Sequence, residues 1–294
     1  HIGFTKSPRA GFFAVLVILL LSVASLVSLY GGSTVFASTM RSQDAVNRSI
    51  QGDFEGARTS ILSALSLSEQ DRYYRTLAAI ELSRLNALVS AGASDEAAQA
   101  KFRELLTNAI NAGQRATDLD SRNYQNWLSR ASVYASVVPL GIEGSSATAE
   151  EALKEAQKYN PQTPEVDYRM AQIRLAMNDA DGATDFAQAA LKKKADYTPA
   201  ILLLAQVSFN EGRLSDAIDS VTSAVVLEPN NSQLIYQLGL LQLQAERYTD
   251  AKTSFEQALA VNPEYANASF FLGQAYVFLN RLTDALIQFK SLQK

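Results

Sequence analysis

The sequence predicts an all-α protein in which one membrane-spanning helix precedes a solenoid of paired helices. Two observations carry this prediction: a long stretch without charge near the N-terminus, and a 34-residue repeat in the C-terminal half. The composition agrees, since 47% of the 294 residues are apolar and can supply a core. The chain has no cysteine, which excludes disulfides, thiolate metal sites and cysteine nucleophiles.

The membrane helix is predicted at residues 11–30. No charged residue occurs from Ala10 to Met40. Twenty apolar residues at about 1.5 Å each extend about 30 Å, the thickness of the hydrocarbon core of a bilayer. Gly31 and Gly32 follow directly and suit the end of a helix. We therefore expect a single-pass membrane protein.

The charges beside this helix predict its orientation. Lys6 and Arg9 lie in residues 1–10, which we expect to be a cytoplasmic stub, with the long C-terminal part on the extracytoplasmic side. The alternative is a signal peptide cleaved after Ala37, but the apolar run exceeds the usual core of about 7–15 residues. Because the chain begins with His1 and not Met, we expect it to be processed or to be a fragment of a longer reading frame.

Charge also limits the class of partner. From residue 38 onward, 24 Lys and Arg stand against 30 Asp and Glu, a net charge of −6. Nucleic-acid binding needs a net basic surface, so we expect no nucleic-acid partner. The one basic run, residues 192–194, suits a solvated helix end, with binding of an anionic lipid or glycan as the alternative.

The solenoid is predicted from columns of similar residues that recur every 34 positions. These are a small residue (Ala171, Ala205, Gly239, Gly273), an alanine (Ala183, Ala217, Ala251, Ala285) and a bulky residue (Val221, Phe255, Phe289). The small residues let the two helices of a unit approach closely, and the bulky residue fills the space between units. Pro229 and Pro263 end two units, because proline cannot continue a helix. No unit can bury its apolar face alone, so neighbouring units must stack.

The motif Leu272-Gly273-x-x-Tyr276 followed by Ala285-x-x-x-Phe289 resembles the tetratricopeptide repeat (TPR). That resemblance implies a right-handed superhelix of about seven helix pairs. Residues 38–70 are then a degenerate first unit, residues 71–161 hold long and insertion-bearing units, and residues 162–294 hold four regular 34-residue units. The motif is specific for fold and unspecific for function.

A narrower resemblance rests on the order of elements. A membrane helix, a degenerate pair, a long unit, residues 123–128 (NYQNWL) and residues 138–144 (VPLGIEG) resemble the C-terminal part of bacterial O-antigen ligase/polymerase-like membrane proteins. This implies an alternative function, an accessory domain of a polysaccharide ligase or polymerase whose catalytic membrane region lies upstream. We expect residues 138–144 to pack on the neighbouring unit, with a partner or membrane contact as the alternative.

The residues give no support for catalysis. The only histidine is His1, ahead of the membrane helix, so the exported part cannot build a Ser-His-Asp triad or a histidine metal cluster. Neither a Gly-rich phosphate loop nor a dinucleotide fingerprint occurs. The acid pairs at residues 95–96 and 150–151 are expected in the first turns of helices, where they suit the dipole. We therefore expect no enzyme and no catalytic, cofactor or metal site.

The expected site is the concave groove formed by the first helices of the units. Its amide and aromatic side chains are Tyr168, Gln172, Gln206, Phe209, Asn210, Tyr236, Gln244, Phe270, Gln274 and Phe278. Such a lining suits an extended peptide, with a sugar face as the alternative ligand. Almost no Lys or Arg is expected in the groove, unlike the carboxylate-clamp TPRs. The leading expectation is a membrane-tethered scaffold that mediates protein–protein interactions in the cell envelope.

Overall fold

The computed structural model describes residues 8–92 and 94–292. These residues form fourteen α-helices and one short 3-10 helix, and no strand occurs among them. The all-α class that the sequence predicts is confirmed. The helices divide into two compact units, an N-terminal unit that ends at Ser136 and a C-terminal unit that begins at Val137.

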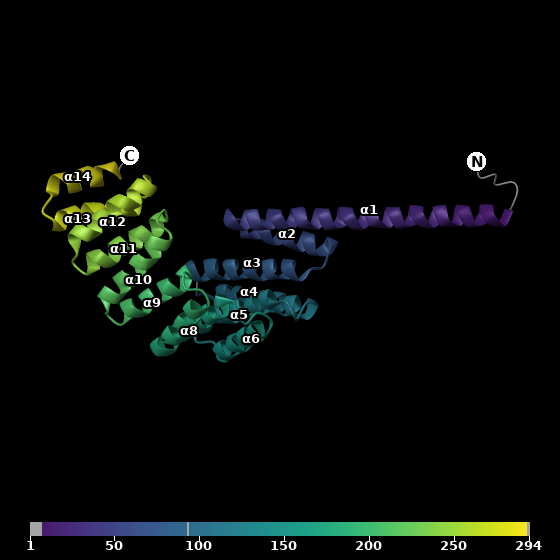
Figure 1. Ribbon diagram of the computed structural model, residues 1–294, viewed down its shortest axis with the longest axis horizontal. Helices are drawn as coiled ribbons and strands as arrows, with labels where there is room; N and C mark the ends of the chain where they lie inside the picture. The colour runs from purple at the N-terminus through teal and green to yellow at the C-terminus, as the bar shows by residue number, and fades with distance from the viewer. Residues whose placement is uncertain (1–7, 93, 293–294) are drawn as a thin grey trace. The chain divides into compact units, whose positions relative to one another are not determined.

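Helix α1 (Pro8–Ile50) begins before the predicted span and ends well beyond it (Figure 1). The helix end expected at Gly31 and Gly32 is wrong, because both glycines lie inside α1. The hydroxyl of Ser33 donates to the carbonyl of Tyr30 at 2.8 Å, within the same helix. Each interior glycine costs a helix about 1 kcal/mol. Ser38 and Ala45, which follow the glycines, are both buried, and this packing opposes a helix end at the glycines.

That packing makes the second half of α1 part of the first helix pair. Its partner is α2 (Phe54–Leu67), which begins where the Asp53 carboxylate accepts a hydrogen bond from the Gly56 amide at 2.9 Å. Ala45 of α1 is fully buried against α2, in a cluster with Ile61 and Tyr73. Residues 38–70, expected as a degenerate unit, thus share their first helix with the apolar segment.

Three further helices complete the N-terminal unit: α3 (Asp71–Ser90), α4 (Glu96–Leu119) and α5 (Tyr124–Ala135). Asp95 caps α4 by accepting from the Ala98 amide at 2.7 Å, as expected of an acid at a helix start. Helix α3 packs against both α4 and α5. The hairpin of α3 and α4 is long, with 20 and 24 residues in its two helices.

Buried charge joins α2 to α3. Glu81 of α3 is fully buried and accepts from Arg58 Nε at 2.7 Å and from Arg84 Nη1 at 2.6 Å. Arg84, itself 8% exposed, also pairs with Glu55 of α2 at 2.6 Å. Each of these charges therefore has a partner of opposite sign at hydrogen-bond distance, which offsets the cost of burial.

The C-terminal unit begins with a short 3-10 helix, η1 (Val138–Leu140), that lies against α7. The rest of the expected insertion turns through Gly141 and Gly144, whose φ angles are +70° and +75°. Leu140 and Ile142 are 48% and 38% exposed. The insertion is thus partly packed and partly open to a contact.

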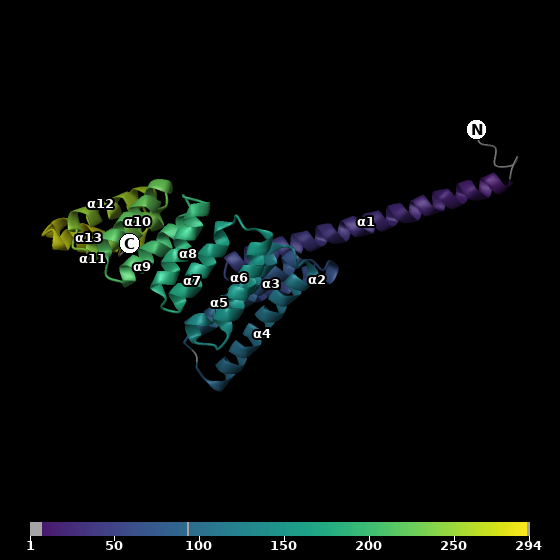
Figure 2. The ribbon, with the colours of Figure 1, turned by 60° about the horizontal axis from the view of Figure 1, so that its bottom comes forward.

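Nine α-helices follow, the last eight of them in four pairs. They are α6 (Ser145–Tyr159), α7 (Pro164–Ala176), α8 (Ala180–Lys193), α9 (Thr198–Asn210), α10 (Leu214–Leu227), α11 (Ser232–Gln244), α12 (Tyr248–Val261), α13 (Ala266–Phe278) and α14 (Leu282–Ser291). Figure 2 shows the pairs stacked along the chain within this unit. The acid pair 150–151 lies in the second turn of α6, not the first, and Glu150 pairs with Arg174 of α7 at 2.9 Å.

The turn inside each of these pairs has the same backbone geometry. Asn178, Gly212, Glu246 and Asn280 lie 34 residues apart and have φ angles of +60°, +77°, +58° and +57°. This left-handed conformation costs a residue with a side chain about 1 kcal/mol or more, and glycine and asparagine tolerate it best. The repeat is therefore as regular in its turns as in its packing columns.

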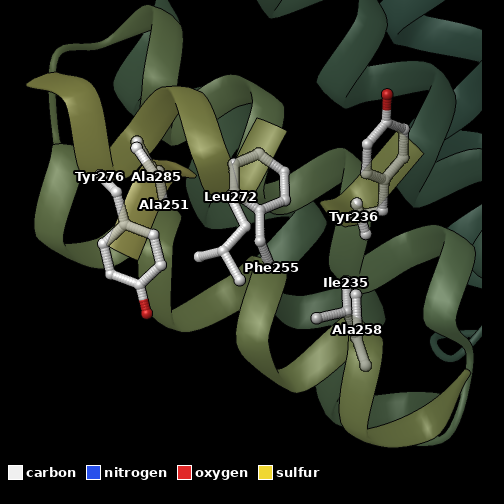
Figure 3. Close-up of a cluster of buried hydrophobic side chains, with 10 residues drawn as sticks. Ile235, Tyr236, Ala251, Phe255, Ala258, Leu272, Tyr276 and Ala285 are labelled. Atoms are coloured by element: carbon white, nitrogen blue, oxygen red, sulfur yellow. The ribbon is translucent and has the colours of Figure 1, made fainter. Parts of the chain in front are cut away.

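The packing columns lie in the core as their spacing requires. A Cβ added to Gly239 would lie 2.6 Å from Cε1 of Phe255, and one on Gly273 would lie 2.5 Å from Cε1 of Phe289. Phe255 is fully buried, with Leu272 in the same cluster (Figure 3). At both positions a side chain on the first helix would crowd the aromatic ring that the second helix packs against it.

Candidate partner-binding groove

The first helices of the last three pairs carry no charged residue. Helices α9, α11 and α13 contain only apolar, hydroxyl, amide and aromatic side chains, with one glycine in each of the last two and one proline in α9. Charged residues nevertheless make up 19% of the chain. The acids recur instead at the starts of the second helices, at Asp216, Asp250 and Asp284. The surface offered by the first helices is therefore electrically neutral.

A hollow of about 710 Å³ lies on α7, α9 and the start of α11, within the range of ligand pockets. It is lined by Tyr168, Gln172, Leu175, Ala176, Thr198, Pro199, Leu202, Leu203, Gln206, Asn210, Glu228, Asn231 and Leu234. A second hollow, of about 420 Å³, is lined by Leu202, Ala205, Gln206, Phe209, Val221, Gln237, Leu240, Leu241 and Gln244. The two hollows share Leu202 and Gln206, and together they form one groove.

Six of the ten residues expected in the groove line it: Tyr168, Gln172, Gln206, Phe209, Asn210 and Gln244. They lie on α7, α9 and α11. The exposed amides of Gln172 and Gln206 are 34 residues apart, so they occupy equivalent positions on successive first helices. The groove thus presents hydrogen-bonding groups at the spacing of the repeat.

Tyr236 is the clearest correction, because it is 8% exposed and lies in the core. Its ring centroid lies 5.0 Å from that of Tyr265 and 5.9 Å from that of Phe271. Aromatic neighbours from α13 and the preceding turn cover it (Figure 3 shows its ring in the cluster). The register of the repeat placed it beside Tyr168, but register does not report what the next unit lays over a side chain.

The remaining three expected residues lie on α13, outside both hollows. Phe270 is 43% exposed and contacts Phe289, with ring centroids 5.8 Å apart. Phe278 is 56% exposed and stacks on Tyr248 at 4.7 Å. Gln274, which lies between these two residues in the sequence, is partly buried. Phe270 and Phe278 thus add exposed aromatic side chains on α13, outside the groove.

Local contacts hold one wall of the groove in place. Gln172 Nε2 donates to the Tyr168 hydroxyl at 2.9 Å, and the Tyr168 ring meets Tyr197 edge-on at 5.8 Å. Burial raises the pKa of Tyr168, so its hydroxyl stays protonated at neutral pH. The Tyr197 hydroxyl in turn hydrogen bonds to Glu165. Tyr168 is therefore a fixed hydrogen-bonding group.

Glu228 is a groove residue that the sequence analysis missed. Its carboxylate accepts from Asn231 Nδ2 at 2.9 Å, and hydrogen bonds from Asn231 and Thr198 lower its pKa, so it is ionised at neutral pH. It is the only charged side chain of the groove. A carboxylate in the turn after a second helix, three residues before the asparagine that caps the next helix, is a local signal that the repeat columns do not contain.

No cluster for metal chemistry is found where the structure is described. Within residues 8–92 and 94–292, no three His, Asp or Glu side chains gather to hold a metal ion. His1 and Lys6 lie outside these residues. The described groups around the groove are suited to hydrogen bonding and apolar contact.

One described helix is long and apolar enough to cross a membrane. Within α1, residues Val15–Ile50 contain a window with a mean hydropathy of 2.3 and no buried residue. The large apolar side chains from Phe12 to Tyr30 are 40–73% exposed. No described residue of the N-terminal unit covers them.

Comparison with known proteins agrees with this architecture. Residues 236–294 match the family model of the tetratricopeptide repeat. Among solved structures, the chain is similar to a thermophilic TPR protein of Thermus thermophilus, with a TM-score of 0.57 and 18% identity over 70% of this chain and 100% of that one. It is also similar to yeast Tom70, with a TM-score of 0.63 and 17% identity over 87% of this chain. The match spans half of the yeast chain.

At these identities the solved structures establish the fold. The class is an α-solenoid of helical hairpins, and residues 236–294 are similar to the tetratricopeptide repeat. No curated protein sequence matches the chain significantly. The narrower resemblance to O-antigen ligase/polymerase-like proteins has no support in these comparisons.

Proposed function

We propose that the chain is a membrane-tethered TPR scaffold whose groove binds an extended segment of a partner protein. The observation that supports this most is the amide lining of the groove, which holds one carboxylate and no Lys or Arg. An extended peptide leaves its backbone N–H and C=O groups unpaired. The side-chain amides of Gln172, Gln206 and Asn210 carry both donors and acceptors that match them.

Apolar groups in the groove supply the rest of the contact. Leu202 lines both hollows, and Phe209 is 37% exposed beside it. Burial of such surface contributes about 25 cal/mol per Å². With one carboxylate and no Lys or Arg, the groove gives no attraction to an acidic peptide. We expect binding that changes little with salt, because screening acts mainly on charge pairs.

The test is a crosslinked pull-down from native membranes with the full chain as bait, read by mass spectrometry. The test variant carries Gln206→Ala and Asn210→Ala, two exposed positions of α9. The matched control carries Gln188→Ala and Gln257→Ala, two exposed positions on the second helices α8 and α12. Alanine favours helix at all four positions, so both variants should fold.

We expect a protein partner that is recovered by the wild type and the control and is reduced about tenfold or more with the test variant. Equal recovery by both variants would remove the groove from the proposal. Recovery of a glycan or of glycan-assembly enzymes in place of a groove-dependent protein would favour the accessory-domain alternative.

The tether in this proposal is the first half of α1. Its exposed apolar surface is long enough to cross a bilayer, and Lys6 and Arg9 favour a cytoplasmic N-terminus with the solenoid on the other side. Ala37 and Ser38, the two sides of the alternative cleavage site, lie within α1, and Ser38 is buried. Protease added to intact spheroplasts should digest the solenoid, and the intact mass of the membrane-extracted chain should include residues 11–30.

A further inference from the structure

We propose that one edge of the N-terminal unit rests on the lipid surface of the membrane that α1 crosses. This membrane-side edge consists of residues 66–72, around the α2–α3 loop, and residues 118–124, around the α4–α5 loop. The inference rests on the proposed function, because it takes α1 as the anchor. It adds a contact surface of the solenoid and names phospholipid headgroups as what covers it.

The first argument is the position of the edge along α1. Tyr73, next to the edge, places its hydroxyl 3.1 Å from Ser38 Oγ and 3.3 Å from Thr39 Oγ1. Ser38 follows Tyr30 by eight residues, or about 12 Å of helix. The headgroup layer adds roughly 5–8 Å on each side of the hydrocarbon core. When residues 11–30 span the core, Ser38 therefore lies about 4–7 Å beyond the headgroup layer, a distance that the long side chains of the edge can bridge.

The second argument is that a continuous helix fixes the distance between the membrane span and the edge. Helix α1 is continuous from Pro8 to Ile50. Gly31 and Gly32 have helical neighbours on both sides, and the Thr34 hydroxyl donates to the Gly31 carbonyl at 2.9 Å. A flexible linker would let the solenoid drift from the membrane, but a single helix transmits both distance and rotation.

The third argument is an apolar surface on α1 that extends to the height of the edge. Val35, Phe36 and Met40 are 48%, 69% and 57% exposed, beyond the twenty residues needed to cross the core. The first charge after the span is Arg41. Apolar side chains of this size are stabilised where they contact lipid, which favours a position of α1 that brings the border of the membrane closer to the edge than the twenty-residue span alone would.

The chemistry of the edge suits phospholipid headgroups. Arg72 and Arg122 are exposed there, and guanidinium groups bind phosphate through paired hydrogen bonds. Arg115, which lies just before the second segment of the edge, forms an ion pair with Glu69 at 2.8 Å. The edge also carries Glu69, Asp71, Asp118 and Asp120, so its two arginines stand against four acids and its net charge is negative. We infer contact with zwitterionic headgroups, held by the geometry of α1 and not by attraction to anionic lipid.

The opposite end of the α3–α4 hairpin supplies an internal reference. Figure 1 shows α1 extending past the membrane-side edge, while the turn from α3 to α4 lies at the other end of the same helices. Helix α3 has 20 residues, which places Ser90 about 30 Å from the edge. In the proposed arrangement Ser90 is therefore far from lipid.

The chain has no cysteine, so single-cysteine variants report one position each. The full chain would be reconstituted into phosphatidylcholine vesicles as Ser66→Cys, Ser121→Cys, Ser90→Cys or Ser22→Cys, each labelled with a fluorophore. All four serines are exposed. Quenching would be measured with spin-labelled lipids that carry the quencher on the headgroup or in the middle of the acyl chain.

We expect headgroup quenching at Ser66 and Ser121 to exceed that at Ser90 at least threefold, and acyl-chain quenching at Ser22. Equal headgroup quenching at Ser90 and Ser121 would overturn the proposed edge. Absence of headgroup quenching at Ser66 and Ser121, with Ser22 still quenched by the acyl-chain probe, would also overturn it and would mean that a protein or a second copy covers the edge. Loss of quenching at Ser22 would instead overturn the anchor itself.

Discussion

In the N-terminal unit α2 and α3 meet across buried charge, whereas in the C-terminal unit α11 and α12 meet across a glycine and an aromatic ring. Glu81 is surrounded by Arg58 and Arg84, at 2.7 and 2.6 Å. The ring of Phe255 lies directly on Gly239. Both contacts hold two helices together, but the first depends on balanced charge and the second on shape.

The difference shows why the repeat is regular in one unit and degenerate in the other. A contact made by shape demands a small residue and a large residue at fixed positions, so it appears as columns at 34-residue spacing. A contact made by charge needs only partners of opposite sign within reach, and long side chains reach them from many positions. The N-terminal unit can therefore keep the hairpin architecture with little trace of the motif.

The largest effect is expected on removal of a buried charge from the N-terminal unit. Glu81→Ala removes the carboxylate that accepts from both Arg58 and Arg84 and leaves Arg84 with Glu55 alone. We expect a loss of about 3 kcal/mol or more, since each hydrogen bond to a charged group contributes about 1.5–3 kcal/mol. Trp127, the only tryptophan, lies in the same unit and reports its unfolding by fluorescence in detergent micelles. Glu104→Ala is the matched control, because Glu104 forms an exposed pair with Lys101 and should cost under about 1 kcal/mol.

Equal stability of the two variants would show that the Glu81 cluster is hydrated in solution. The contrast between the two units would then not depend on buried charge, and the degeneracy of the N-terminal repeat would need another explanation.

A smaller effect is expected from crowding the shape-based contact of the C-terminal unit. Gly239→Ala places a methyl group against Phe255, which is fully buried and cannot swing aside. Overpacking costs about 1–3 kcal/mol, partly offset by the better helix propensity of alanine. Gly273→Ala is the matched comparison, because Phe289 is only partly buried and has room to move. Thermal melting followed by circular dichroism should show a clear loss for the first variant and little for the second.

A similar loss in both variants would mean that Phe289 is held as firmly as Phe255. No loss in either would remove the argument that glycine is required at these columns.

The same contrast explains what the sequence made predictable. Gly239, Phe255 and Ala251 recur at a fixed period, so the pairs of the C-terminal unit follow from counting. The continuation of α1 beyond Gly31 could not be read in this way, because it depends on packing of Ser38 and Ala45 against later helices. Local glycine signals indicate a helix end only where no tertiary contact opposes them.

Part of the groove was also predictable from the regular spacing of the repeat. Gln172 and Gln206 follow the register of the first helices, and the structure places both in the groove. Tyr236 shares the register of Tyr168, yet Tyr265 and Phe271 cover it. Glu228 lies in a turn outside every column. Register predicts the direction of a side chain from its helix, and burial depends on residues from the next unit.

Alkaline pH should change the stability of the two units in opposite directions. The Tyr276 hydroxyl donates to Glu256 Oε1 at 2.8 Å in the C-terminal unit, and burial together with this bond raises the pKa of Tyr276 to about 12. Its stabilising effect is complete below pH 10, the pKa in the unfolded chain, and is lost as the pH rises towards 12. In the N-terminal unit, burial opposes ionisation of Tyr73, but hydrogen bonds with Ser38 and Thr39 and from Arg72 outweigh burial and lower its pKa. Tyr73 therefore adds stability above pH 10.

From pH 9 to pH 11 the C-terminal unit should lose about 1 kcal/mol through Tyr276. Unfolding by urea would be followed by circular dichroism for the whole chain and by Trp127 fluorescence for the N-terminal unit. Tyr276→Phe should remove this part of the loss. If the free energy of unfolding changes equally with pH in the wild type and in the variant, the Tyr276 hydroxyl is hydrated in solution and its pKa is not raised.

The smallest effect is expected at the glycines of α1, where the sign should be opposite to that at Gly239. A Cβ on Gly31 or Gly32 meets nothing within 4 Å. Alanine there should stabilise the helix by about 0.5–1 kcal/mol at each position, since it restricts the unfolded chain and creates no clash. Backbone hydrogen exchange of α1 in micelles should slow about two- to five-fold around these residues. Unchanged or faster exchange would show that α1 bends or is contacted at this point, and the solenoid would then not be held at a fixed distance from the anchor.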